Sequence, residues 1–404
     1  MRNLPDVQIS LPLGMKGIKV IGLKENNGSL TILVQKALEF GLCPVCGTIS
    51  QKVNDRYVHR VTDRPIFENG TRIEVLKRRW KCVNDFCEVN TFTEELEGLP
   101  KKWTHTDLFY QDVYQLSRRM TYTRVYEHLQ DAKCQVSLST VYQKAQEQLR
   151  KEVVLPEVVE ASFIGLDEFS KGKGHDYGVV LTNLERNKII DVTDGGKTKK
   201  AASRLLTELD PSKVKACCID MWRPFRDACR DVLPHALVVV DRFHVIKEVN
   251  EALDKVRKRA RNHQRSRQKK EALSRYKKLI LMGIEKLTPG QESLLWEILS
   301  WYRDLTRSYE LKELLRAIYA GQDAQKASQE IDNWIEEAKI SGIKEMEEAA
   351  KTLTNWRREI LNFWVYPITN AVTEGKVNKI KVLRRRAYNY NNFQSLRLKI
   401  LEQE

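Results

Sequence analysis

Apolar and polar positions alternate along the chain with two different periods, which divides it into strand-rich and helix-rich regions. After residue 156 the apolar runs are short and rich in β-branched residues. They predict strands at 162–170, 177–183 and 188–193, a helix at 198–209, a strand at 214–220, a helix at 224–232 and a strand at 236–241. This region is therefore expected to be an α/β domain.

Three strands followed by alternating helices and strands is the order of an RNase H-like fold, in which the first and fourth strands are neighbours. Asp167 and Asp220 come at the ends of those two apolar runs, so we expect them to face each other where α/β sheets place their ligands. Acids at such positions are costly to bury without a cation. Glu168 is expected to point to the opposite face and to solvent, because adjacent strand residues alternate.

A third acid, Glu374, begins a strongly basic helical pattern after residue 370. The predicted inward face of this helix is apolar and contains Val377, Ile380, Leu383 and Ala387. The predicted DNA-binding residues of this helix are Asn378, Lys379, Lys381, Arg384, Arg385 and Arg386. A solvated basic helix with one incidental glutamate is the alternative.

Three carboxylates beside so much positive charge indicate phosphodiester chemistry. Asp167, Asp220 and Glu374 are expected to hold two Mg²⁺ (or Mn²⁺) ions about 3.5–4 Å apart, which activate the attacking oxygen and stabilise the leaving oxygen. For either aspartate alone, an acid that ends a strand at a turn is the simpler interpretation. The two together favour a metal site.

Four of the eight cysteines are clustered near the amino terminus, as Cys43-Pro-Val-Cys46 and Cys82-Val-Asn-Asp-Phe-Cys87. They bracket Asn69-Gly70, a pair that predicts a β-hairpin. This spacing predicts a zinc ribbon with one structural Zn²⁺ held by Cys43, Cys46, Cys82 and Cys87. Four free thiols are the alternative, and His59 is favoured as a surface residue over a substitute ligand.

Two further features of the first 150 residues predict contact with DNA. Arg78 and Arg79 lie beside Trp80 in the ribbon, and this basic surface with its aromatic ring is expected to lie on the DNA backbone, with a solvated strand face as the alternative. The segment from residue 104 to 150 predicts short helices, capped at Thr121 or Thr123 and at Ser137 or Ser139. Two of them predict a helix-turn-helix whose second helix offers Thr140, Gln143 and Lys144 to a major groove.

The overall charge agrees with this interpretation. The 404 residues carry a formal net charge of +15, which favours a polyanion such as nucleic acid, ahead of an anionic membrane surface. No apolar run approaches the roughly 20 residues that span a bilayer, and no signal-peptide pattern is present. We expect a cytoplasmic protein, in which clustered cysteines bind metal rather than form disulfides.

Several motifs, in order, resemble those of the bacterial insertion-sequence transposases of the ISL-three family, a branch of the DDE recombinases. They are Cys43-Pro-Val-Cys46-Gly, Arg79-Trp-Lys-Cys82, Asp167-Glu-Phe-Ser-Lys-Gly, Asp220-Met-Trp-Arg-Pro-Phe225, Asp241-Arg-Phe-His244 and Thr373-Glu-Gly-Lys. The resemblance implies that Asp167, Asp220 and Glu374 are the catalytic triad and that a helical insertion precedes the last acid. Asp241 and His244 are expected to support the site, although a structural hydrogen bond at a helix start is favoured for His244.

Together these observations predict a multidomain α/β protein with an RNase H-like core. The expected domains are 1–100, a zinc ribbon with an amino-terminal arm; 101–155, a helix-turn-helix; 156–246, the first part of the core; 247–365, an all-α insertion; and 366–404, the final core helix and tail. Five tryptophans fall in the insertion and are expected mainly in its core.

The expected function is transposition of the insertion sequence that encodes the chain. The protein would bind the terminal inverted repeats, cut the DNA and transfer the freed strand to target DNA, working as a homodimer at synapsis in the bacterial cytoplasm, associated with the nucleoid. Its partners would be double-stranded transposon ends and target DNA, with no membrane. A DNA-binding regulator with an inactive core and a structure-selective nuclease are the alternatives.

Overall fold

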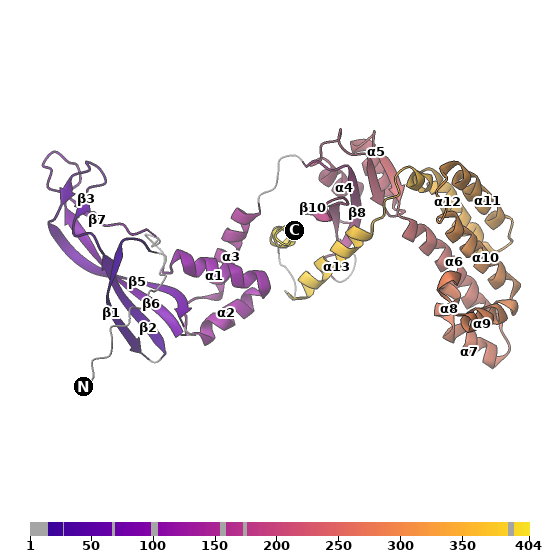
Figure 1. Ribbon diagram of the computed structural model, residues 1–404, viewed down its shortest axis with the longest axis horizontal. Coiled ribbons are helices and arrows are strands. Elements are labelled where there is room, and N and C mark those ends of the chain that lie inside the picture. Colours follow the sequence, from indigo (N-terminus) through magenta and orange to yellow (C-terminus); the bar gives the residue numbers. More distant parts are fainter. Residues whose placement is uncertain are drawn as a thin grey trace. The chain divides into compact units, whose positions relative to one another are not determined.

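The computed structural model describes residues 15–404 except 27, 67–68, 98–103, 154–158, 173–175 and 387–391. The chain separates into two compact units, Met1–Val154 (unit 1) and Leu155–Glu404 (unit 2) (Figure 1). In the described part of the chain, no helix is both long and apolar enough to cross a membrane.

Unit 1 combines strands with three helices among its described residues. In chain order the elements are β1 (Ile18–Asn26), β2 (Ser29–Lys36), β3 (Gly41–Leu42), β4 (Ile49–Ser50), β5 (Val53–Ile66), β6 (Asn69–Lys81), β7 (Thr91–Thr93), α1 (Asp107–Arg119), α2 (Tyr122–Asp131) and α3 (Leu138–Glu152). The main sheet has the order β1-β2-β6-β5, with β7 paired to β6, and β3 pairs with β4.

The predicted hairpin is present as β5 and β6, which pair antiparallel. Asn69 and Gly70 nevertheless begin β6 instead of forming the turn, and positions 67–68 lie outside the described residues. A Cβ at Gly70 would stand 2.4 Å from the carbonyl oxygen of Lys133, just after α2. The glycine is explained by this close approach of two backbones, and the turn assignment of Asn69-Gly70 was wrong.

The helices of unit 1 begin where the sequence predicts caps. Thr121 accepts a hydrogen bond from the backbone N–H of Arg124, and Ser137 accepts one from Thr140. Each bond satisfies a donor that the first helical turn leaves open. The three helices pack around a shared apolar cluster that contains Phe109, Val113, Val125, Leu129, Val141 and Ala145.

Unit 2 begins with the predicted α/β domain and continues into helices. Its elements are β8 (Phe163–Ser170), β9 (Tyr177–Asn183), β10 (Lys188–Thr193), α4 (Lys199–Leu206), β11 (Ala216–Ile219), α5 (Arg223–Val232), β12 (Leu237–Val240), α6 (Arg242–His263), α7 (Arg267–Arg275), α8 (Lys277–Leu281), η1 (Ile284–Lys286), α9 (Pro289–Ser300), α10 (Arg303–Ile318), α11 (Ala324–Lys339), α12 (Lys344–Leu361), η2 (Asn362–Trp364), α13 (Ala371–Arg386) and α14 (Phe393–Leu401).

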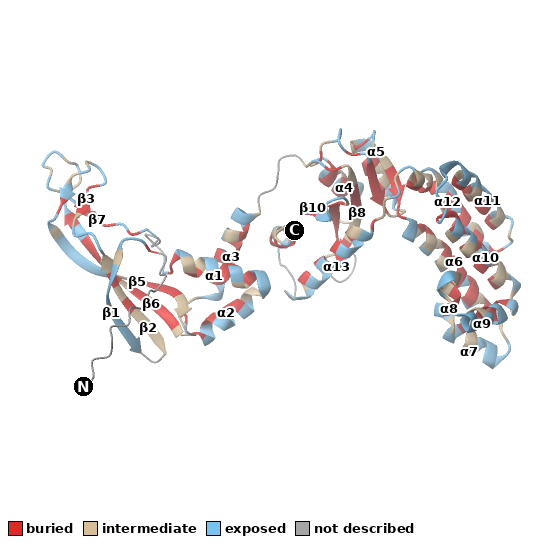
Figure 2. Ribbon diagram, in the orientation of Figure 1, coloured by how far each residue is buried: buried red, intermediate tan, exposed pale blue. Residues whose placement is uncertain are grey.

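The sheet of unit 2 has the order β10-β9-β8-β11-β12. β8, β9 and β10 pair antiparallel, whereas β11 runs parallel to both β8 and β12. The first and fourth strands are therefore neighbours, as the order of elements in the sequence predicts. Figure 2 shows buried residues concentrated on these strands.

The two faces of this sheet are covered by different helices. Ile164 and Leu166 of β8 belong to the core cluster that includes α4 and α5. Phe169 of the same strand belongs to another cluster, with α13 and α14. Because strand residues alternate between faces, Gly165 and Asp167 share the α13 side with Phe169.

Helices α6 to α12 form the predicted insertion between β12 and α13. The expected domain boundary at residue 247 falls inside α6, which runs without a break from Arg242 to His263. Trp334 is fully buried and donates to the carbonyl of Leu311 at 2.7 Å, and Trp356 is also buried. Trp296 is 40% exposed. The expectation that the five tryptophans of the insertion lie mainly in its core therefore holds less well for Trp296 than for the others.

Candidate active site and metal centres

The four clustered cysteines of unit 1 converge as their spacing predicts. One sulfur atom from each of Cys43, Cys46, Cys82 and Cys87 lies within 4.8 Å of the others. The Sγ atoms of Cys43 and Cys87 are 3.8 Å apart, and those of Cys46 and Cys82 are 3.6 Å apart. Tetrahedral zinc with Zn–S bonds of about 2.3 Å requires sulfurs about 3.8 Å apart, so the four thiols fit a zinc ion. His59 is not part of this cluster.

The charges of these thiols also fit a bound cation. Hydrogen bonding with Thr48 lowers the pKa of Cys46 to about 6, which favours the thiolate that zinc requires. At Cys87 a backbone hydrogen bond with Val89 lowers the pKa of the thiol. Burial and the neighbouring sulfurs outweigh this bond and raise the pKa of Cys87 to about 12. Four crowded sulfurs cannot all ionise unless a cation joins them.

Two residues that the sequence assigned to a DNA-facing surface of the ribbon are buried. Arg78 pairs with Glu94 at 3.0 Å and donates to the carbonyl oxygens of Lys36 and Leu38. Trp80 is 1% exposed, and a Cβ at Gly41 would stand 2.5 Å from its ring. Both side chains stabilise the fold of the ribbon, so the prediction that they lie on DNA was wrong, whereas Arg79 is exposed.

Asp167 and Asp220 meet at one end of the parallel β8–β11 ladder in unit 2. The pairing ends at Gly165 of β8, with Asp167 further along that strand, and Asp220 directly follows β11. β8 continues to Ser170 in pairing with β9, so Asp167 does not end its strand as the apolar pattern suggests. Oxygen atoms of the two carboxylates lie within 4.8 Å of each other.

Crowding of these carboxylates has an electrostatic cost. Burial, followed by the charges of Asp220 and Glu168, raises the pKa of Asp167 to about 7. A divalent cation would relieve this repulsion, because Mg²⁺ prefers oxygen ligands and is bound through one or two carboxylates. The residues present therefore fit the predicted metal.

Glu168 differs from its prediction as a solvent-facing acid. It is half-buried and forms an ion pair with Lys197, whose ammonium group also lies 4.4 Å from the Tyr177 ring centroid. One of its oxygens falls within the same 4.8 Å cluster as Asp167 and Asp220. Its side chain is one methylene longer than that of aspartate, which lets the carboxylate reach this cluster from a strand position that points the other way.

Glu374 lies in the first turn of α13, and this turn is attached directly to β8. The Asn370 side chain donates to the carbonyl oxygen of Leu166 at 3.0 Å, and the hydroxyls of Thr373 and Thr182 are 2.6 Å apart. Glu374 is exposed and lines a cavity together with Asp241. Its carboxylate is outside the 4.8 Å cluster of the described acids, but the anchor holds its helix beside the strand that carries Asp167.

Gly165 permits this anchor, a role that its position within an apolar strand did not reveal. A Cβ there would stand 2.3 Å from Oγ1 of Thr373 and 2.5 Å from Oδ1 of Asn370. We expect Gly165→Ala to push α13 away from β8 and to lower DNA cleavage by about 10²-fold, since a displacement of about 1 Å at a reacting centre costs that much. A cleavage assay checks this.

Gly290→Ala is the matched control for this prediction. A Cβ at Gly290 would meet nothing within 4 Å, so the control variant should keep wild-type cleavage and melting temperature. Cleavage by Gly165→Ala at the wild-type rate would mean that the close approach of α13 is not needed.

His244 contacts Asp220 and Asp241, the acids that directly follow the parallel strands β11 and β12. Its Nδ1 is 2.9 Å from Oδ1 of Asp220 and 3.7 Å from Oδ2 of Asp241. Burial opposes a charge on the imidazole, but the two carboxylates outweigh burial and raise the pKa of His244 to about 10. Asp241 itself caps α6 by accepting from the N–H of Phe243. The imidazole therefore lies against both carboxylates.

The basic helix α13 has the two faces that the sequence predicts. Val377, Ile380 and Leu383 are buried against the sheet, and Asn378, Lys379, Lys381, Arg385 and Arg386 are exposed; Ala387 lies outside the described residues. Arg384 differs, because its guanidinium donates to the carbonyl oxygens of Ser170 and Lys171. It therefore holds the end of β8 and is not free to bind DNA as predicted.

Helix α3 shows a similar mixture. Gln143 is exposed and Thr140 is half-exposed, as a DNA-facing surface requires. Lys144 is buried; its ammonium group lies 2.8 Å from Glu147 and 4.9 Å from the centroid of the Tyr110 ring. The prediction that Lys144 faces a groove was therefore wrong, since an acid and an aromatic ring within unit 1 already bind its charge.

Comparison with known proteins decides the family. Residues 164–400, more than half of the chain, match the DDE transposase family ISL3 (ISL-three), and residues 39–87 match the zinc finger of the IS204/IS1001/IS1096/IS1165 transposases. The chain belongs to the ISL3 family of insertion-sequence transposases. The family resemblance noted in the sequence is thereby confirmed, and the cysteine cluster lies in the family's zinc ribbon.

Individual ISL3 relatives are similar over long stretches. The transposase for insertion sequence element IS1001 of Bordetella parapertussis is 28% identical over 390 residues, which are 95% of this chain and 94% of the relative. The transposase for insertion sequence element IS1557 of Mycobacterium tuberculosis is 25% identical over 259 residues, 58% of each chain. Membership of this family implies an enzyme that cleaves and transfers nucleic acid.

Proposed function

We propose that this ISL3 protein binds the terminal inverted repeats of its own insertion sequence and catalyses metal-dependent DNA cleavage and strand transfer. The observation that carries the proposal is the pair Asp167 and Asp220 on adjoining parallel strands, with Glu374 in the first turn of a helix anchored to one of them. The strand order supports the proposal of an RNase H-like core with an all-α insertion before the last acid.

Asp167, Asp220 and Glu374 are the residues that would hold two Mg²⁺ or Mn²⁺ ions. When bound, such ions activate the attacking oxygen and stabilise the leaving oxygen of an in-line displacement. The protein fixes the positions of these ligands. The sheet sets the spacing of Asp167 and Asp220, the Asn370 and Thr373 contacts hold α13, and His244 orients the Asp220 carboxylate.

The reaction would proceed in two displacements at phosphorus. In the first, a water oxygen forms a bond to the phosphorus at the transposon end and the bond to the 3′ oxygen breaks, which leaves a free 3′-hydroxyl. In the second, that hydroxyl attacks a phosphodiester of target DNA, and the broken P–O bond releases a target 3′ oxygen. The proposal includes no side-chain nucleophile, so no covalent protein–DNA intermediate forms.

Binding of double-stranded transposon ends and target DNA is assigned to exposed basic and polar side chains. On α13 these are Asn378, Lys379, Lys381, Arg385 and Arg386; on α3, read as the second helix of a helix-turn-helix, Thr140 and Gln143; and in the ribbon, Arg79. The net charge of +15 supports a polyanionic partner. Synapsis of two ends favours a homodimer, acting on DNA in the bacterial nucleoid.

A cleavage and joining assay tests the proposal. The full chain is incubated with a labelled duplex that carries the element's own end, and with the same duplex after the end sequence is scrambled. We expect Mg²⁺-dependent nicking at the end, joining of the freed strand to a second duplex, and neither product with the scrambled sequence or with EDTA. An inactive regulator would bind the end without cutting it. A structure-selective nuclease would cut branched DNA without end preference and would not join strands.

A further inference from the structure

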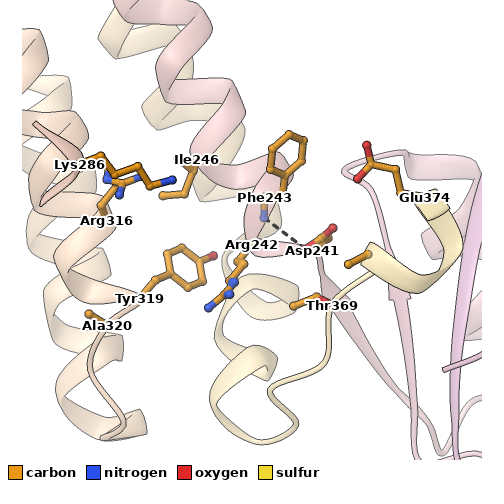
Figure 3. Close-up of a pocket in the computed structure, with 11 residues that line it drawn as sticks. Asp241, Arg242, Phe243, Ile246, Lys286, Arg316, Tyr319, Ala320, Thr369 and Glu374 are labelled. Carbon is orange, nitrogen blue, oxygen red and sulfur yellow. Dashed lines mark hydrogen bonds between the residues drawn. The ribbon is translucent and has the colours of Figure 1, made fainter. Parts of the chain in front are cut away.

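A cavity opens beside the acids, between the insertion and the start of α13, all within unit 2. Its volume is about 520 Å³, within the range of sites that bind small molecules or single groups of a larger ligand. Asp241 and Glu374 line one side of it, and Arg316 and Tyr319, from and directly after α10, line the other (Figure 3). A ligand in this cavity would therefore lie next to the DNA position that the acids act on.

An aromatic ring projects into the opening of this cavity. Phe243, near the start of α6, is 56% exposed although it is large and apolar. In Figure 3 its ring points outward between Ile246 and Glu374 instead of packing against the helices. Exposure of an apolar ring to water does not stabilise the protein, but the ring offers a flat face on which a nucleobase can stack.

A buried hydroxyl on the opposite wall has no partner within the described protein. Tyr319 is only 8% exposed, and its ring stacks on Trp364 with centroids 5.0 Å apart. The hydroxyl oxygen is buried and forms no hydrogen bond, and in Figure 3 it points toward the Arg242 side of the cavity. A buried unpaired hydroxyl is costly, so a polar atom of a ligand would stabilise this arrangement.

Cations line the same cavity. Arg316 is already paired with Glu285 and Glu313. Arg242 and Lys286 remain as cavity-lining cations, suited to a phosphate group. A flat apolar face, a polar group and positive charge around one cavity match the base, base edge and phosphate of a single nucleotide.

We propose that this cavity binds one nucleotide that has left the base stack at the transposon end, next to the phosphate that is cut. Its base stacks on Phe243, a polar edge bonds to the Tyr319 hydroxyl, and its phosphate lies near Arg242 and Lys286. The nucleotide is unpaired because a base in a duplex cannot reach into a cavity of this kind. This inference rests on the proposed function, since it places the cavity beside the reacting strand.

Binding to duplexes with a single unpaired nucleotide tests this inference without requiring catalysis. A series of duplexes carries the element's end, each with a mismatch at one position near the cleavage site. Because a mismatched nucleotide costs less free energy to unpair and unstack than a paired one, wild type should bind one or two of these duplexes about tenfold more tightly than the paired end. The dissociation constants are measured by fluorescence anisotropy without divalent ions.

Three variants connect the effect to the cavity. Phe243→Ala should lose most of the preference for unpaired DNA, and Tyr319→Phe should reduce it without destabilising the fold, because the hydroxyl it removes has no partner. Ile340→Ala changes an apolar side chain that is 80% exposed elsewhere in the insertion, and should keep the wild-type preference.

Equal wild-type affinities for paired and mismatched ends at every position would overturn the inference, and so would a preference that Phe243→Ala retains. Failure of the proposed function looks different. In that case the protein would show the binding preference, yet neither cut nor join the paired end with Mg²⁺.

Discussion

Replacing Asp220 with asparagine is expected to lower Mg²⁺-dependent cleavage and joining of transposon ends by at least about 10³-fold. Metal ligation supplies several kcal/mol of transition-state stabilisation, and each 1.4 kcal/mol is about tenfold in rate. Asparagine keeps the size of the side chain but removes the charge that faces Asp167, and it weakens the contact of Asp220 with His244. Single-turnover cleavage of an end-containing duplex measures the loss.

Two further measurements separate a catalytic role from a structural one. Mg²⁺ should raise the melting temperature of wild type, because it binds only the folded site, and should raise that of Asp220→Asn less. Affinity for the end should stay close to wild type, since Asp220 is not among the DNA-binding residues. Asp231→Asn, which changes an exposed acid paired with Lys199, is the control and should keep activity within about twofold. Wild-type cleavage by Asp220→Asn would show that this residue is not a metal ligand.

Replacing Cys46 with serine is expected to remove zinc from the protein and to unfold the ribbon locally. Structural zinc contributes about 10–16 kcal/mol in isolated zinc-finger peptides, more than the small apolar cluster of Cys43, Trp80 and Phe92 can replace. Metal analysis should show about one zinc per wild-type chain and little in the variant. Limited proteolysis should show new cuts between residues 39 and 93.

The matched control for the zinc prediction is Cys134→Ala. Cys134 is buried among the helices of unit 1 and is outside the sulfur cluster, so this variant should retain its zinc whatever it loses in stability. Burial raises the pKa of Cys134 to about 11, which makes it a poor metal ligand. Full zinc content in Cys46→Ser would contradict the four-cysteine assignment.

The α/β core was predictable because its strands are buried on both faces. Such strands leave continuous apolar runs in the sequence, so each acid that interrupts a run stands out. Asp167 within β8 and Asp220 after β11 were found in this way, and the predicted adjacency of these strands is confirmed. The cysteine cluster was predictable for a similar reason, because ligand spacing is a local property of the chain.

The contacts that hold Glu374 in place were not predictable from local patterns. Gly165 accommodates Thr373, a residue more than two hundred positions away in the chain. Nothing in the sequence next to Gly165 distinguishes a close helix approach from a bulge or an ordinary strand glycine. The cavity side chains Phe243 and Tyr319 were missed as well, because exposure of one ring and burial of one hydroxyl depend on packing between distant helices.

The prediction that a basic residue binds DNA was wrong where the fold supplies a partner for its charge. Arg78 and Arg384 belong to basic runs and Lys144 to the predicted recognition helix, yet each binds a carboxylate or backbone carbonyl of its own unit. Sequence shows that a charge is present but not whether the fold neutralises it. The cations Arg79 and Lys381 remain exposed, although Arg79 also pairs with Asp55 at 3.4 Å.

In the sequence, Glu374 is separated from Asp167 and Asp220 by the whole insertion. It lies on α13, a helix near the carboxyl end of the chain. Translation that stops between residues 154 and 370, or a frameshift in that interval, yields a product without Glu374 and without the Asn370 and Thr373 contacts that hold its helix. Such a product keeps all of unit 1. Under the proposed function, fragments of this kind occupy the element's ends without cutting them, and so act as repressors of its movement.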